Sequence, residues 1–127
     1  MTENEVSGQI VDAAIKVHTV LGPGLLESVY EAALAYELEK RGFKVLRQHP
    51  IPVIFEEVHL ECGFRADLIV QDLVMVELKA VEQVHPVHKK QLLTHLRLTG
   101  KRVGLLINFN VELLKDGVTR VANNFRE

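Results

Sequence analysis

The chain has 127 residues, of which 47% are hydrophobic and 25% charged, and this ordinary globular composition excludes a disordered chain or a coiled coil. Its 15 lysines and arginines against 17 acidic residues give a net charge of −2, so bulk charge does not favour nucleic-acid binding. The length predicts a single domain over residues 1–127.

The chain begins with two helical patterns. Apolar residues spaced by three and four predict an amphipathic helix over residues 6–20. The Gly-Pro-Gly run at residues 22–24 ends this helix, and a second apolar stripe predicts another helix over residues 26–40. We therefore expect two helices joined by a tight turn.

The apolar period then changes to two, which is typical of strands. Residues 43–47 and 51–55 predict two strands, and the prolines beside the second place it at the edge of a sheet. Residues 63–70 and 73–79 are apolar on both faces except at a few charged positions. We therefore expect two central strands joined by a hairpin at residues 71–72.

The last third of the chain predicts one more helix and two strands. Pro86 suits the first turn of a helix over residues 86–98, which Gly100 ends. Residues 103–109 predict a buried strand, and residues 118–121 a short final one. This order of elements indicates an α/β fold in which helices flank a mixed central sheet.

Charged residues interrupt the two central strands. Glu77 and Lys79 are two apart, so they project from the same face of their strand. A three-residue hairpin loop would place Asp67 opposite Glu77 and Arg65 opposite Lys79. A two-residue loop would send the two carboxylates to different faces. The hypothesis of a common site therefore depends on the register of the hairpin.

Asp67 and Glu77 predict a metal site if they meet. Adjacent carboxylates repel each other unless a cation lies between them, and Mg²⁺ or Mn²⁺ suits such oxygen ligands. Lys79 beside the ion could orient a water or stabilise charge on a phosphoryl oxygen, as metal-assisted phosphodiester hydrolysis requires. The alternative is a pair of surface carboxylates, with Lys79 in a local ion pair. Because unpaired charges are costly in apolar strands, we favour the metal site.

Several motifs together resemble a known family. Residues 24–30, Gly-Leu-Leu-Glu-Ser-Val-Tyr, match the motif of the GxxExxY proteins. Asp67 with Glu77-Leu78-Lys79 is similar to the metal centre of the PD-(D/E)xK nuclease superfamily, to which that family is assigned. The resemblance runs from about residue 10 to residue 124. It implies a PD-(D/E)xK nuclease-like core and cleavage of DNA or RNA.

The resemblance also suggests roles for residues on the helices. Glu27 matches a helix glutamate that reaches the metal in related proteins, although a carboxylate in a first helical turn is also favoured by the helix dipole. Tyr30, three residues on, could orient Glu27 or belong to the core. Gln91 resembles the glutamine of the Q-x-x-x-Y motif beside the metal centre, but His95 stands where that motif has tyrosine.

Lysines and arginines gather on and after the same helix. They are Lys89, Lys90, Arg97, Lys101 and Arg102. These residues could contact nucleic-acid phosphates, or they could form a solvated helix face. No aromatic residues interleave with them, so base stacking has little support. His85 and His88 could suggest a zinc pair, but Pro86 separates them and we expect loop histidines.

Two functions from different classes remain open. The first is a divalent-metal-dependent nuclease in which Asp67, Glu77 and Glu27 bind Mg²⁺ or Mn²⁺. In this function Lys79 acts on the attacking water and Gln91 supports the site. The second is a catalytically inactive nuclease-like protein that serves in binding or regulation.

The sequence also bears on location and assembly. Cys62 is the single cysteine, which excludes an internal disulfide and suits a reducing compartment. No apolar run is long enough to cross a membrane and the N-terminus is acidic, so we expect a cytoplasmic protein with no membrane partner. Because basic surface is scarce, we expect a homodimer that pairs through the edge strand near residues 51–55.

Overall fold

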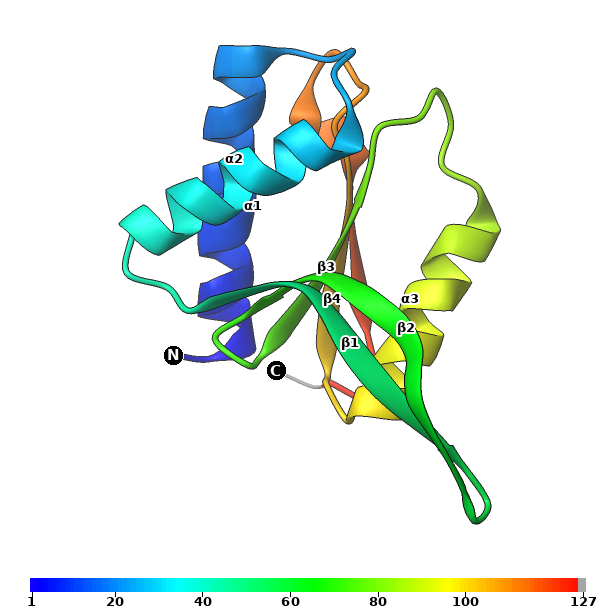
Figure 1. Cartoon of the computed structure of the whole chain (residues 1–127). Helices are drawn as coiled ribbons and strands as arrows, with labels where there is room; N and C mark the ends of the chain where they lie inside the picture. Colours follow the sequence, from blue (N-terminus) through cyan, green and yellow to red (C-terminus); the bar gives the residue numbers. More distant parts are fainter. Residues whose placement is uncertain (126–127) are drawn as a thin grey trace.

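The computed structural model describes residues 1–125, which form a mixed sheet with helices on both faces (Figure 1). The last two residues of the expected domain lie outside the described residues. In chain order the elements are α1 (Glu3–Leu21), α2 (Glu27–Lys40), β1 (Val45–Phe55), β2 (Val58–Val70), β3 (Val74–Lys79), α3 (Pro86–Thr99), β4 (Val103–Asn108), the 3₁₀ helix η1 (Leu114–Gly117) and β5 (Val118–Ala122). The expected α/β class is confirmed.

The sheet follows the chain, with strand order β1-β2-β3-β4-β5. The β3–β4 pair is parallel and every other pair is antiparallel. A parallel pair needs a crossover connection, and α3 supplies it between β3 and β4. Helices α1 and α2 lie on the opposite face of the sheet from α3 (Figure 1).

Each face of the sheet has its own core. Val76 and Leu78 belong to the cluster under α1 and α2, whereas Met75 packs with Leu92 of α3. The alternation expected for β3 is therefore confirmed. It follows that Glu77, between Val76 and Leu78, points to the α3 face of the sheet.

The strand β1 differs from expectation. The sequence predicted two separate strands over residues 43–47 and 51–55. This prediction is wrong, because β1 runs unbroken through both prolines. Pro50 and Pro52 are tolerated because β1 is an edge strand with a partner on one side only. The pairing register shifts between Ile51 and Val53, next to these prolines.

The far halves of β1 and β2 form an arm that projects from the body of the molecule (Figure 1). Residues 52–63 contribute to neither hydrophobic core. Ile54, Phe55 and Val58 on the arm are 61%, 65% and 55% exposed. Among the described residues, no helix has the length and apolarity needed to cross a membrane.

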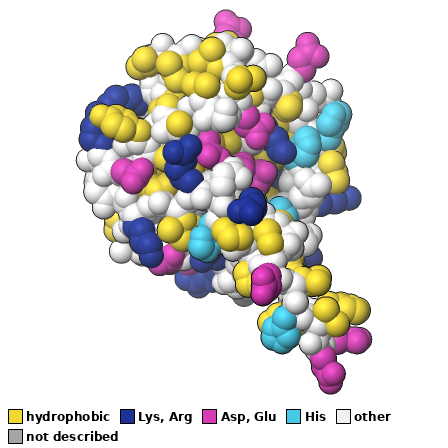
Figure 2. Space-filling view, in the orientation of Figure 1, with side chains coloured by type: hydrophobic (Ala, Val, Ile, Leu, Met, Phe, Trp, Pro, Cys, Tyr) yellow, Lys and Arg dark blue, Asp and Glu magenta, His cyan; other side chains and the backbone are white. Residues whose placement is uncertain are grey.

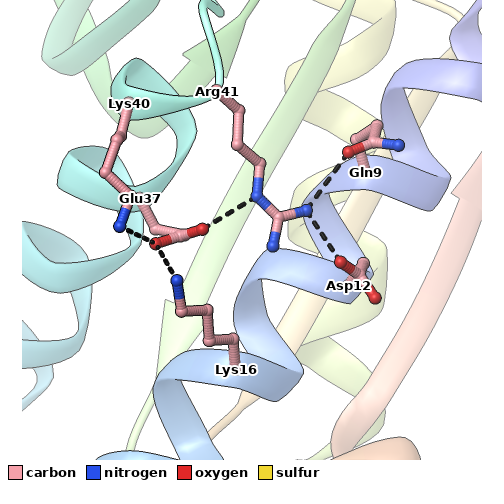
Figure 3. A network of polar contacts seen from close by, with 6 residues as sticks. All are labelled: Gln9, Asp12, Lys16, Glu37, Lys40 and Arg41. Carbon is pink, nitrogen blue, oxygen red and sulfur yellow. Dashed lines mark hydrogen bonds and ion pairs between the residues drawn. The ribbon is translucent and has the colours of Figure 1, made fainter.

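A buried glutamate ties α1 to α2 (Figure 3). Glu37 of α2 accepts hydrogen bonds from Lys16 Nζ at 3.0 Å and from Arg41 Nε at 2.9 Å. Arg41 also reaches Asp12 of α1 at 2.8 Å, and Lys40 lies 3.4 Å from Glu37. The hydrogen bonds from Arg41 and Lys16 lower the pKa of Glu37 to about 2.

Candidate active site

The β2–β3 hairpin has the register that a common site requires. Leu68 pairs with Val76 and Val70 with Val74, which leaves a loop of three residues, 71–73. Of the two loop lengths that the sequence left open, the structure has the three-residue one, and residue 73, expected in the second strand, belongs to the loop. Continuing the pairing by one residue puts Asp67 directly opposite Glu77.

β2 separates from β3 at Asp67. The β2–β3 ladder ends at the pair Leu68 and Val76, and beyond it Asp67 Oδ2 accepts the backbone N–H of Leu78 at 2.8 Å. The side-chain carboxylate thus takes the place of a main-chain partner and opens the sheet here. Burial raises the pKa of Asp67, and the hydrogen bonds from Leu78 and Gln48 act in the opposite direction.

The carboxylate of Glu77, which lies in this opening, has only partial compensation for its charge. Its Oε1 lies 3.9 Å from Lys79 Nζ, which is an ion pair but too long for a hydrogen bond. Its Oε2 is buried without a hydrogen-bond partner. Burial, and then the charge of Asp67, raise the pKa of Glu77 to about 7. An unpaired buried carboxylate oxygen is costly, so this position requires an explanation.

Glu27, the first residue of α2, approaches the same opening from the other side. Burial raises its pKa, followed by the charge of Asp67, while Lys79 acts in the opposite direction. The charge of Glu27 in turn raises the pKa of Glu77. The structure therefore brings Glu27, Asp67, Glu77 and Lys79 into one electrostatic cluster.

Tyr30 belongs to the core and does not orient Glu27. Its side chain is fully buried and stacks on Phe109 with ring centroids 4.5 Å apart. Its hydroxyl donates to the carbonyl of Gly22 at 2.6 Å and accepts the N–H of Leu25 at 3.1 Å. Tyr30 thus fixes the turn between α1 and α2, from which Glu27 begins its helix.

One side of α3 faces the cluster. The charge of Lys79 acts on the pKa of His88, and the charge of Asp67 acts on that of His95. Gln91 lies about one helical turn from each of them, and its side chain is exposed. His95 stacks on Phe64 of β2 with ring centroids 3.8 Å apart, and its buried Nδ1 has no hydrogen-bond partner.

Lys89 and Lys90 of α3 lie over the other edge of the sheet, near β5. Lys89 and Lys90 line a hollow of about 430 Å³ together with Arg120 of β5, a residue that the sequence did not single out. β5 and β2 are separated by β3 and β4 in the sheet. The lysines therefore lie on a different side of α3 from His95, which faces β2.

The other basic residues of this group have separate positions. Arg97 is exposed on α3. Lys101 Nζ donates to the carbonyl of Asp72 at 2.9 Å, and Arg102 forms an ion pair with Glu3 at 2.8 Å. The structure therefore does not bring all five into a single patch.

Two residues of the site, Glu31 and Gln48, were not predicted from the sequence. Glu31, one turn after Glu27 on α2, is buried and accepts hydrogen bonds from Arg47 at 3.2 Å and from Gln48. The spacing of four between the glutamates was a signal that could have revealed Glu31. Gln48 joins Glu31 to Asp67. Figure 2 shows acidic side chains gathered between α2 and α3, with lysine or arginine and histidine side chains beside them.

The chemistry of these donors fits a hard divalent cation. The buried Oε2 of Glu77 has no hydrogen-bond partner, and Asp67 and Glu27 add oxygen ligands of the same charge. Within residues 1–125, no three His, Cys, Asp or Glu side chains are arranged to hold a metal ion as they stand. His85 and His88 cap the start of α3, where His88 Nδ1 accepts the N–H of His85 at 3.2 Å.

A family model described as the PD-(D/E)XK nuclease superfamily matches residues 4–121 of the chain. Searches of curated proteins and of solved structures gave no significant match. The mixed five-stranded sheet with three α-helices is consistent with the fold of that superfamily.

Proposed function

The chain belongs to the PD-(D/E)XK nuclease superfamily, and from this we propose that it hydrolyses nucleic-acid phosphodiester bonds with a divalent cation. The observation that carries this proposal is the buried Oε2 of Glu77, which has no hydrogen-bond partner and lies on the residue opposite Asp67. A cation shared by the two carboxylates would relieve both the unpaired oxygen and their mutual repulsion.

Each residue of the cluster has a role in this proposal. Asp67 and Glu77 bind Mg²⁺ or Mn²⁺, and Glu27 is the third ligand. Lys79, whose Nζ lies 3.9 Å from Glu77, orients the attacking water and stabilises charge on a phosphoryl oxygen. Gln91 supports the site from α3. When bound, the cation supplies polarisation of the phosphate and a lower pKa for the attacking water.

Nucleic-acid contacts are proposed for the basic residues of α3 and the segment after it. Lys89, Lys90, Arg97 and Lys101 neutralise phosphates in this proposal. Arg120 joins them through the hollow that it shares with Lys89 and Lys90. The recognition is directed at the backbone of DNA or RNA, because no Phe, Tyr or Trp lies between Lys89 and Lys101.

Three finer assignments accompany the proposal. The Gly24, Glu27 and Tyr30 motif supports membership of the GxxExxY branch. The exposed, unpaired Cys62 suits a cytoplasmic protein. The exposed apolar residues of the arm, Ile54 among them, support a homodimer.

A second candidate is a nuclease-like binding or regulatory protein without turnover. The observation that favours it is the separation of the basic hollow over β5 from the carboxylate cluster over β2 and β3. A polyanion held only at the hollow would lie over β5 and not over the carboxylate cluster.

The test is cleavage of end-labelled single-stranded and double-stranded DNA and RNA with Mn²⁺, with Mg²⁺ and with EDTA. We expect cleavage that EDTA abolishes and that Lys79→Met reduces by about 100-fold or more, because methionine keeps the apolar stem but loses the charge. The melting temperature of Lys79→Met should stay close to that of the wild type. Lys115→Met removes an exposed lysine of η1 and serves as the matched control.

The outcomes separate the two candidate functions. Equal cleavage by wild type and Lys79→Met would move the chemistry away from this cluster. Binding of nucleic acid without cleavage under any of these conditions would favour the binding protein.

A further inference from the structure

Gln48 has an unusual backbone for a residue inside a paired strand. Its φ is 46°, which lies in the left-handed region that glycine adopts far more readily than other residues. Arg47 pairs with Leu68 and His49 pairs with Ala66, so the register is the same on both sides. No inserted residue explains the conformation, and strained backbones of this kind concentrate at functional sites.

The side-chain amide of Gln48 joins two carboxylates. Nε2 donates to Glu31 Oε1 at 2.5 Å and to Asp67 Oδ1 at 3.0 Å. An amide nitrogen has two hydrogens, so both are used. Glu31 is buried on α2 and is held from its other oxygen by Arg47 at 3.2 Å. The Nε2 group of Gln48 is therefore held by a helix residue through one hydrogen and orients Asp67 through the other.

An amide is well suited to this position because it is neutral. A lysine or arginine could also hold Asp67, but it would neutralise the charge that a cation needs. With Gln48 on Oδ1 and the N–H of Leu78 on Oδ2, each oxygen of Asp67 accepts one hydrogen bond. Each oxygen then keeps a second lone pair for another partner.

We propose that Gln48 is a positioning residue of the divalent-cation site, which fixes the Asp67 carboxylate in its ligating orientation and is itself held by Glu31. The inference rests on the proposed function, because it requires Asp67 to be a ligand. Partners that orient metal ligands typically change metal affinity by about tenfold or more when they are removed.

The test compares Gln48→Gly with Glu56→Gly, using isothermal titration with Mn²⁺ and melting curves in EDTA. Glu56 has a φ of 54° in the turn of the arm, so glycine relieves the same backbone strain there, far from the cluster. We expect both variants to melt close to the wild type. Gln48→Gly should bind Mn²⁺ about tenfold more weakly, whereas Glu56→Gly should bind as the wild type does.

The outcomes are separable. Wild-type Mn²⁺ affinity in folded Gln48→Gly would overturn the positioning role and leave the proposed function intact. An absence of Mn²⁺ binding in the wild type would overturn the proposed function and this inference together. If Gln48→Gly does not fold, Gln48→Asn replaces it, because asparagine tolerates a positive φ and keeps the amide but is one methylene shorter. Wild-type affinity in that variant would then be the contradicting result.

Discussion

At the scale of single residues, Glu77 combines burial, a like-charged neighbour and an oxygen without a partner. Its pKa is about 7 in the folded protein, against an ordinary value of 4.5. The folded state therefore holds this proton more tightly than the unfolded state does. By linkage, Glu77 lowers the free energy of unfolding as the pH rises from about 4.5 to about 7.

We predict that Glu77→Gln stabilises the protein above pH 7 in the absence of divalent metal. Glutamine cannot ionise, so the gain could reach about 3 kcal/mol, as the pKa shift implies. Urea unfolding in EDTA at pH 4 and pH 8 measures the gain, which should be present at pH 8 and almost absent at pH 4. Glu82→Gln, on an exposed glutamate after β3, is the control. An equal gain at both pH values would contradict the ionisation of Glu77 as its cause.

Residue patterns predicted part of this site. The period of two correctly placed Glu77 and Lys79 on one face of a strand. It could not decide the hairpin register, because Gln71 and Asp72 take positive φ values of 56° and 55° without a glycine to signal the turn. No sequence pattern indicated a role for Gln48, because both its backbone conformation and its contact with Glu31 depend on tertiary structure.

At the scale of elements, the contact between α1 and α2 depends on the network around Glu37. The pKa of Glu37 is lowered to about 2 by its hydrogen bonds with Arg41 and Lys16. A lowered pKa gives stability that is present above the unfolded value of 4.5 and is lost as the pH falls towards 2.

We predict that Glu37→Gln lowers the melting temperature at pH 7, because Lys16 and Arg41 lose their shared carboxylate. The difference from the wild type should shrink as the pH falls from 4.5 towards 2, where the wild-type carboxyl also becomes protonated. Melting curves across this range measure the effect. Glu39→Gln, an exposed glutamate of the same helix, should leave the melting temperature unchanged. A deficit that stays constant with pH would indicate a packing effect.

The elements were easier to predict than their junctions. Apolar spacing gave α1, α2 and α3 to within a few residues, and Gly100, with a φ of 70°, ends α3 as expected. Pro50 and Pro52 misled the prediction of β1, because proline interrupts a ladder only where its missing N–H is needed. The same two prolines nevertheless predicted the edge position correctly, since β1 has a partner on one side only.

At the scale of the whole molecule, the arm formed by β1 and β2 stands outside both cores. A fold gains little stability from strands that bury few side chains. Exposed apolar residues on such an arm, as at Ile54 and Phe55, are typical of an association surface.

We predict that replacing residues 53–62 with Asn-Gly leaves the melting temperature within a few degrees of the wild type and abolishes self-association. Asn-Gly closes a two-residue hairpin between the strands that remain. Light scattering should give about twice 14.3 kDa for the wild type and one copy for the shortened chain. The double variant Ile54→Ser and Phe55→Ser tests the same surface at full length. A shortened chain that still dimerises would place the interface elsewhere.

The half-titrated state of Glu77 has a consequence for any measurement of cation binding. A carboxyl with a pKa of about 7 carries about half a proton at neutral pH. A cation that takes this oxygen must expel that proton into the buffer. The heat of Mn²⁺ binding should therefore depend on the ionisation enthalpy of the buffer chosen. The apparent dissociation constant should fall by up to about tenfold for each unit by which the pH rises towards 7, and it should level off above pH 7. Comparing the binding heat in two buffers gives the number of protons released per cation bound. This number would report on the protonation of Glu77 without any nucleic acid present.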